Sequence, residues 1–198
     1  MGLPAPLAAY ICWPMILLRH GQSEFNLHFT ATKRDPGIVD APLTELGHAQ
    51  AAAAAQELAA SGVKRIIASP YTRALQTAEP LARRLGLPVL VTSAVRERYK
   101  FACDIGSPRT VLEQAWPTHD FSAIEEVWWP DEEEGAEQVV HRARGFRETM
   151  AALPDWSETL VVSHWGFILS MTGKSVMNGT WLHCDPTVAA PDVLVWRP

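Results

Sequence analysis

The sequence predicts a single α/β domain, residues 1–198, in which helices cover both faces of a mostly parallel sheet. Short continuous apolar runs alternate along the chain with longer segments of helical periodicity, a pattern typical of strands buried in a parallel sheet. No internal repeat and no change of composition typical of a linker divides the 198 residues. We therefore expect one three-layer α/β/α domain with a sizeable core.

The first predicted strand, 15–18, follows an irregular lead-in at 1–14. A loop is expected at 28–40. Thr44 suits the N-cap of a helix whose alanine-rich sequence continues to residue 60.

The second predicted strand, 64–68, leads into Ser69 and Pro70, a pair that indicates the start of a helix. Pro80 lies within this helical pattern, so we expect a kink or a break between two short helices. A third, short strand is predicted at 88–91.

The periodicity then weakens, and a segment at about 98–134 is expected to form a lid-like insertion at the carboxyl end of the third strand. It contains a short helix from Ser107 to about Trp116. The acidic run 131–134 is expected to be a solvated surface that favours the start of the next helix.

The last part of the chain predicts a helix at 137–153, a strand at 159–162, a helix at 167–172 and a closing strand at 193–196. The apolar face of the first of these helices is expected to combine Val140, Ala143, Phe146 and Met150.

Composition and charge exclude several classes of protein. A net charge of −5 argues against a nucleic-acid-binding protein, and no apolar run approaches the ~18 residues of a membrane span. The amino end lacks the basic region of a secretion signal. Cys12, Cys103 and Cys184 are far apart, so we expect free thiols and a cytoplasmic protein. With no closely spaced His/Asp cluster, neither a metal nor a cofactor is expected.

Three predicted strands end in chemically functional residues. Arg19 and His20 follow the first strand, Arg73 follows the second, and His164 follows the strand at 159–162. The carboxyl ends of parallel strands meet at one edge of a sheet, where ligands of α/β folds bind. Two arginines and two histidines there predict a pocket for a phosphate-like dianion. Gly21 is expected to let the backbone approach the phosphate closely.

Four segments, in order, resemble the motifs of the histidine phosphatase superfamily, the phosphoglycerate-mutase-like enzymes. They are 19–26 (RHGQSEFN), 42–47 (PLTELG), 69–78 (SPYTRALQTA) and 162–164 (VSH). The resemblance extends from about residue 15 to residue 173 and implies the phosphoglycerate-mutase-like fold.

The resemblance implies that His20 is the nucleophile that is transiently phosphorylated, with His164 stabilising charge in the transition state. It implies that Arg19, Arg73 and Asn26 hold the phosphate oxygens. His20 must be neutral at its attacking nitrogen, so its other ring nitrogen needs a fixed partner, and we expect a backbone carbonyl.

The leaving oxygen needs a proton, and the family places a glutamate after the third strand. Glu97 is the corresponding residue here. Burial and substrate phosphate would raise its pKa, whereas the neighbouring cations would lower it. An exposed loop glutamate without a catalytic role is the alternative.

Gly21, Ser23 and Trp165 complete the residues expected to contact the substrate. Trp165 is a departure, since the family often has glycine directly after the second histidine. Its indole must line the pocket or point elsewhere. The segment after Glu97 also lacks the mutase-type pattern, which leaves the substrate open.

The segment after Glu97 is rich in aromatic residues, which either line the leaving-group side of the site or pack the insertion onto the body of the protein. They are Tyr99, Phe101, Trp116, Phe121, Trp128 and Trp129. An aromatic pocket would favour bulky or planar phosphate esters.

The function that the resemblance implies is that of a metal-independent, histidine acid-type phosphatase, which hydrolyses a small-molecule phosphate ester. A phosphoglycerate-mutase-like isomerase is the alternative, although that branch usually has longer insertions. A non-catalytic phospholigand-binding protein is the third possibility. The oligomeric state stays open.

Overall fold

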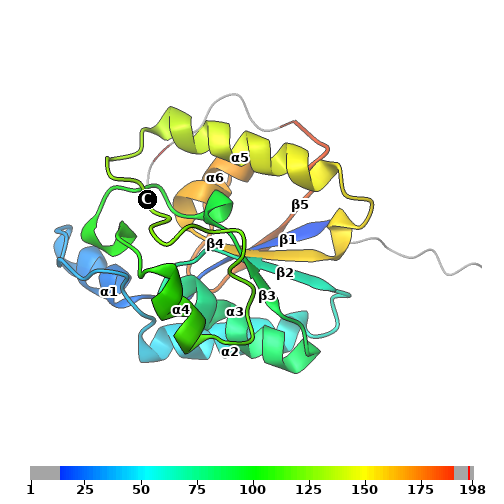
Figure 1. The fold of residues 1–198 in the computed structure, drawn as a ribbon, viewed down its shortest axis with the longest axis horizontal. Helices are drawn as coiled ribbons and strands as arrows, with labels where there is room; N and C mark the ends of the chain where they lie inside the picture. Colours follow the sequence, from blue (N-terminus) through cyan, green and yellow to red (C-terminus); the bar gives the residue numbers. More distant parts are fainter. Residues whose placement is uncertain (1–13, 190–195, 197–198) are drawn as a thin grey trace, which may run out of the picture.

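The computed structural model describes residues 14–189 and residue 196, which form a five-stranded sheet between two layers of helices (Figure 1). The strand order is β3-β2-β4-β1-β5. The four strands that pair in parallel are β1 (Met15–Arg19), β2 (Arg65–Ala68), β3 (Val89–Val91) and β4 (Thr159–Ser163). The α/β class and the mostly parallel sheet predicted from the sequence are confirmed.

The fifth strand lies elsewhere than expected. β5 (Trp181–Cys184) pairs antiparallel with β1, and Met15 lies opposite Cys184. Of the strand predicted at 193–196, residues 193–195 lie outside the described residues, and Trp196 is not in a strand. The sequence of β5 is mixed and only Cys184 is buried, so this edge strand lacks the apolar run that marked the others.

Helices cover both faces of the sheet. In Figure 1, α2 (Glu45–Leu58) and α3 (Thr72–Leu85) lie below it, and α5 (Ala136–Ala151) and α6 (Trp165–Thr172) lie above it. Ile16 and Leu18 of β1 belong to the lower core, whereas Met15 and Leu17 belong to the upper one. This alternation is what a strand buried on both faces requires.

The loop expected at 28–40 begins later, because a helix, α1 (Glu24–Thr32), occupies its first part. Ser23 and Asn26 form a capping box: the Asn26 N–H donates to Ser23 Oγ (3.3 Å), and the Ser23 N–H donates to Asn26 Oδ1 (3.1 Å). The two residues predicted to contact phosphate or substrate therefore also fix the start of this helix.

Pro80 does not break α3, which runs unbroken from Thr72 to Leu85. The expected division into two helices is wrong. Leu75, Ala78 and Leu81 on this helix are buried. Their packing outweighs the roughly 3 kcal/mol that an interior proline costs.

The insertion at 98–134 contains a short 3-10 turn, η2 (Ala102–Asp104), and the helix α4 (Arg109–Ala115). Its backbone continues the sheet beyond β3, since the Val91 N–H donates to the Asp120 carbonyl (2.8 Å) and the Asp120 N–H donates to the Val89 carbonyl (2.9 Å). The edge of β3 is therefore covered. Two further 3-10 turns are η1 (Ser93–Val95) and η3 (Trp156–Glu158).

The acidic run at 131–134 is only partly a solvated surface. Glu134 is buried, and its carboxylate pairs with Arg96 (3.1 Å) and Arg142 (2.7 Å). In the helix that follows, Val139 is buried in place of Val140, while the other three predicted core positions are buried as expected. Among the described residues, no helix is long and apolar enough to cross a membrane.

Candidate active site

The register of the sheet brings together the carboxyl ends of β1, β2 and β4, which lead into the predicted site residues. Arg19 lies opposite Ser163, and Ala68 lies opposite Val162, so the next residues of the three strands are neighbours at one edge. Backbone bonds continue the ladder by one step, from the His20 N–H to the Ser163 carbonyl (3.0 Å). The site is thus positioned by the strands β1, β2 and β4.

His20 is 3% exposed, and its Nδ1 lies 2.7 Å from its neighbour's carbonyl oxygen, that of Gly21. A carbonyl only accepts, so the ring proton is on Nδ1 and Nε2 carries the lone pair. Burial lowers the pKa of His20 well below its usual value, and the cations Arg73 and Arg19 lower it further. The ring is therefore a neutral base with a fixed tautomer.

Gly21 is required by its contact with the start of α2. A Cβ on Gly21 would overlap the carbonyl oxygen of Gly47, and a Cβ on Gly47 would overlap the carbonyl of Gln22. The Gly21 N–H donates to Thr77 Oγ1 on α3 (3.1 Å). The two glycines thus allow the backbone of the His20 loop to contact the backbone of α2 directly.

His164 is fully buried, and its ring centroid lies 4.9 Å from that of His20. Its Nε2 lies 2.7 Å from the hydroxyl of Ser69 at the end of β2, and its buried Nδ1 has no partner among the described residues. Burial lowers its pKa well below the usual value, followed by the charge of Arg73. The direction of this bond depends on the tautomer of His164; in the tautomer in which the Ser69 hydroxyl donates to Nε2, Nδ1 carries the proton and is a donor for a ligand.

The two arginines are held by backbone carbonyls. Arg19 Nη1 donates to the Val176 carbonyl (2.8 Å), while its buried Nε has no partner within the described chain. Burial lowers the pKa of Arg19 to about 10, partly offset by the charge of Glu97, so it stays a cation near neutrality. Arg73, 3% exposed, donates to the Cys103 carbonyl (2.8 Å) and pairs with Asp104 (3.1 Å).

Glu97 follows η1, and its carboxylate accepts the N–H groups of Arg98 (2.8 Å) and Gly166 (3.0 Å). Burial raises the pKa of Glu97, and the charge of Asp104 raises it further. The two N–H groups that donate to the carboxylate lower it in part. Gly166 fits this contact because a Cβ there would press on the carboxylate and lie 3.2 Å from the Trp196 ring.

Asn26, Ser23 and Trp165 all lie around this edge. Asn26 Oδ1 accepts from Ser23 and from Nδ2 of Asn178 (3.1 Å), which fixes the orientation of the amide, and its Nδ2 is the group that can donate to a phosphate oxygen. The Trp165 indole N–H donates to Ser175 Oγ (2.9 Å), and its ring meets that of Trp196 edge-on at 5.8 Å.

Sequence reasoning missed three residues that contact the predicted ones: Ser69, Asp104 and Asn178. Ser69 lies within a recognised segment, so its strand-end position was a usable signal. Asn178 Nδ2 donates to the His20 carbonyl (3.1 Å) from the loop before β5, and neither it nor Asp104 lies in a patterned stretch. Only the folded chain brings them to the site.

The aromatics of the insertion mainly pack it onto the body of the protein. Phe121 and Trp128 lie in the lower core, where Trp128 meets Tyr71 edge-on at 4.7 Å. Phe101 joins Phe25 and Phe29 of α1 in a separate cluster. For these residues the packing alternative is the one the structure supports.

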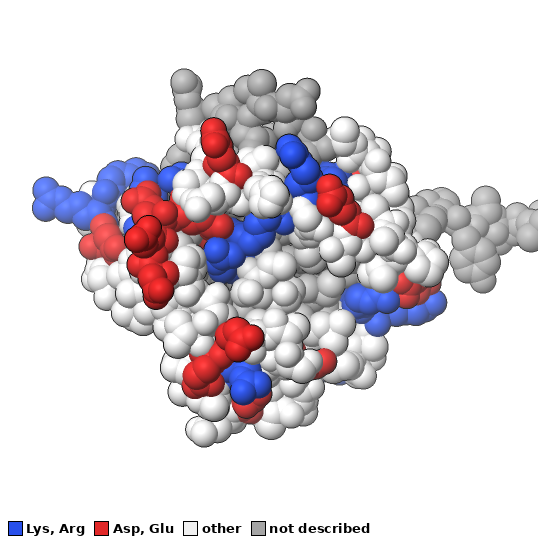
Figure 2. All heavy atoms as spheres, turned by 45° about the horizontal axis from the view of Figure 1, so that its top comes forward, with Lys and Arg blue, Asp and Glu red and all other residues white. Residues whose placement is uncertain are grey.

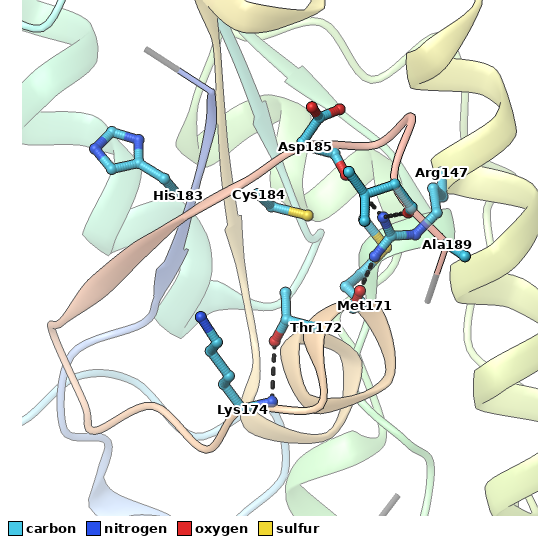
Figure 3. A pocket seen from close by; sticks show the side chains of 9 residues that line it. Arg147, Met171, Thr172, Lys174, His183, Cys184, Asp185 and Ala189 are labelled. Carbon is cyan, nitrogen blue, oxygen red and sulfur yellow. Dashed lines mark hydrogen bonds between the residues drawn. The ribbon is translucent and has the colours of Figure 1, made fainter. Parts of the chain in front are cut away.

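A separate pocket of about 210 Å³ lies at the far end of β1 from His20, because it is lined by Cys184, which lies opposite Met15 (Figure 3). Arg147 of α5 borders this pocket and donates to the carbonyls of Met171, Asp185 and Val188. The arginine thereby ties α5 and α6 to the loop after β5. The pocket contains none of the predicted site residues.

Charge and possible metal ligands add two observations. On the face drawn in Figure 2, lysines and arginines lie in small groups beside acidic side chains and form no continuous basic surface. Within the described part of the chain, no group of three or more His, Cys, Asp or Glu side chains could hold a metal ion.

Comparison with known proteins agrees with this geometry. The profile of the histidine phosphatase superfamily (branch 1) matches residues 15–183. A glucosyl-3-phosphoglycerate phosphatase of Mycolicibacterium vanbaalenii is 31% identical over 166 residues, covering 80% of this chain and 72% of that protein. A probable phosphoglycerate mutase of Cronobacter sakazakii is 33% identical over 159 residues, covering 75% of this chain and 67% of that protein.

A solved structure gives the same result. The complex of a mycobacterial glucosyl-3-phosphoglycerate phosphatase with inorganic phosphate is similar with a TM-score of 0.58 and 25% identity, over 85% of this chain and 87% of that chain. These relatives are named as glucosyl-3-phosphoglycerate phosphatases and as a probable phosphoglycerate mutase. With a profile match across both histidines and both arginines, the chain belongs to the histidine phosphatase superfamily.

Proposed function

We propose that the protein is a metal-independent phosphomonoesterase that works through a phosphohistidine on His20. The observation that carries this proposal is the state of that ring: buried, neutral, and with Nδ1 held by the Gly21 carbonyl. A fixed neutral imidazole with a free lone pair on Nε2 is what a nucleophile for phosphorus requires.

In the first step, Nε2 of His20 attacks phosphorus and the bond from phosphorus to the leaving oxygen breaks. Arg19, Arg73 and Nδ1 of His164 donate to the phosphoryl oxygens, whose charge is spread in the transition state. Gly21, Asn26 and Ser23 shape the loop that carries His20. Protonated Glu97 gives its proton to the departing alkoxide.

In the second step, water attacks the phosphorus of phosphohistidine and the N–P bond breaks. The Glu97 carboxylate accepts the proton that water loses, and inorganic phosphate leaves. His20 returns to its starting state, with the proton still on Nδ1. Proton and charge therefore balance over the two steps without a metal ion.

The mutase reading remains the second candidate, since one relative is named as a probable phosphoglycerate mutase. In that reaction the phosphoryl group returns from His20 to another hydroxyl of the substrate. The mutase branch usually carries longer insertions than this chain of 198 residues can hold, which favours hydrolysis. The substrate is a small-molecule phosphate ester in either case.

The test is a panel of phosphate monoesters, including an aryl phosphate, a nucleoside monophosphate and phosphoglycerate, assayed for inorganic phosphate release. We expect turnover, and we expect acid-labile, base-stable phosphate on the trapped enzyme. His20→Ala should abolish both, whereas His28→Ala, on the exposed part of α1, should change neither. Isomerisation of phosphoglycerate without phosphate release would favour the mutase, and full activity of His20→Ala would refute the mechanism.

A further inference from the structure

The Arg73 guanidinium is held by the turn at 100–104, which lies outside the four segments that resemble the motifs of the family. Its Nη2 pairs with Asp104 Oδ1 at 3.1 Å, and its Nη1 donates to the Cys103 carbonyl at 2.8 Å. The two side chains of the pair are 3% and 2% exposed. A buried ion pair of this kind is kept only where its geometry is well satisfied.

Asp104 is itself fixed before it meets the arginine. Its Oδ2 accepts the backbone N–H groups of Lys100 (3.1 Å) and Phe101 (3.0 Å), which closes the turn η2 around the carboxylate. The Tyr71 hydroxyl donates to the Asp104 carbonyl at 2.6 Å. The carboxylate therefore has little freedom to follow a moving guanidinium.

The plane of the guanidinium is fixed as well. Cζ of Arg73 lies 4.3 Å from the centre of the Tyr71 ring, which also meets the His164 ring edge-on at 5.2 Å. A guanidinium has five N–H groups, and two of them are held by the oxygens of Cys103 and Asp104. Within the described residues the guanidinium makes no other hydrogen bond, so three of its N–H groups remain for an anion.

We propose that Asp104 is a positioning residue of the phosphate site: by holding one side of the Arg73 guanidinium, it directs the remaining donors toward the phosphoryl group. The proposal rests on the proposed role of Arg73 in binding phosphate. It assigns a role to the turn at 100–104, which is part of the insertion that the sequence left unexplained.

Charge alone predicts the opposite effect from positioning. A carboxylate near the site repels a phosphate dianion, so removing its charge would tighten phosphate binding. If Asp104 instead preorganises Arg73, removing the charge frees the guanidinium and weakens binding. The sign of the change in affinity therefore separates the two roles.

The experiment measures the affinity of the protein for orthovanadate and for inorganic phosphate. Asp104→Asn keeps the size of the side chain and its acceptor for the turn, and we expect affinity to fall about 10-fold or more, as when a charged hydrogen-bond partner is lost. Asp104→Glu keeps the charge but moves the carboxylate, so it should also bind more weakly. Asp155→Asn, which removes a surface partner of Arg65, is the control and should bind like wild type.

A double-mutant cycle separates positioning from a general structural role. In an Arg73→Met background, Asp104→Asn should change affinity by less than about 2-fold, because its effect acts through Arg73. Circular dichroism and thermal midpoints establish which variants are folded. If Asp104→Asn is not folded, the anion affinity of Asp104→Glu tests the role of Asp104 in its place.

The possible failures differ. Wild-type or tighter binding by both Asp104 variants, with weak binding by Arg73→Met, would overturn the role of Asp104 alone. If the losses of affinity in Asp104→Asn and Arg73→Met multiply in the double variant, the two residues act independently, which would also overturn the role of Asp104. A wild-type protein that binds neither anion would overturn the proposed function and this inference together.

Discussion

At the residue scale, burial moves the pKa values of the proposed nucleophile and the proposed acid in opposite directions. It lowers the pKa of His20, as burial disfavours a cation, and it raises the pKa of Glu97, as burial disfavours an anion. The proposed reaction needs a neutral His20 and a protonated Glu97. Both shifts therefore widen the pH range in which the two required forms coexist.

Glu97→Gln tests this assignment through the pH profile of kcat. Wild-type kcat should fall as pH rises through the raised pKa of Glu97, since the acid is then ionised, and this alkaline limb should be missing in the variant. The remaining rate should be lower mainly for alkyl phosphates, because a basic leaving oxygen depends most on a proton donor. The measurement is kcat against pH for one alkyl and one aryl phosphate.

Glu133→Gln, an exposed neighbour of the same charge type, is the matched control and should keep the alkaline limb. An unchanged limb in Glu97→Gln, or an equal loss of rate for alkyl and aryl substrates, would show that another group is the acid.

At the scale of the elements, α3 depends on a residue far away in the chain. Tyr71 at its N-cap makes no side-chain cap. Asp40 takes that part: its carboxylate accepts the Thr72 N–H (2.9 Å) and hydroxyl (2.6 Å), and the Ser107 hydroxyl (2.6 Å). One carboxylate thus joins the loop before α2, the start of α3 and the insertion.

Asp40→Ala should lower the free energy of unfolding by about 2 kcal/mol, because it removes the cap and leaves the Thr72 N–H without a partner. For a protein of this size we expect the thermal midpoint to fall by about 4–8 °C. Thermal unfolding followed by circular dichroism measures it. Asp155→Ala, a partly exposed surface aspartate, should shift the midpoint far less, and a similar loss in both variants would contradict the capping role.

The elements that the sequence predicted are those whose signal is local. Continuous apolar runs identified β1, β2 and β4, and Thr44 marked the start of α2. The strand β5, which was not predicted, is an edge strand held by pairing with β1. The helix α3 continues through Pro80 because the residues around it are buried. Tertiary pairing and packing leave no local trace in a sequence.

At the scale of the whole molecule, ligand binding should be visible as added stability. Orthovanadate binds the folded site and not the unfolded chain, so at about 100 times its Kd it should add about 2.7 kcal/mol. The thermal midpoint should then rise by about 5–10 °C. EDTA should change neither the midpoint nor the activity. Loss of activity on chelation, restored by Mg²⁺ or Zn²⁺, would contradict a metal-independent mechanism.

Some residues of the candidate site could be predicted from local sequence patterns, and others could not. His20 and His164 could be placed together because each directly follows a strand of a parallel sheet, and Arg73 could be added because it lies at the start of the helix after β2. Asp104 and Asn178 could not, because their contacts depend on the paths of a turn and a loop that carry no periodic pattern. The burial of Glu134 could not be predicted either, because it depends on a pair with Arg96, 38 residues earlier, as well as on Arg142 of the following helix.

The glycine contact between the His20 loop and α2 links the chemistry to the way the molecule opens. Besides this contact, the Thr44 N–H donates to the Gln22 carbonyl (2.9 Å) and the Glu24 N–H donates to the Pro42 carbonyl (2.9 Å). The loop therefore cannot detach while α2 stays docked, and the two form one cooperative unit. The hydrogen-bonded amides of residues 21–24, Thr44 and Gly47 should exchange with solvent at a common opening free energy, so that His20 is as protected from local unfolding as the helix it rests on.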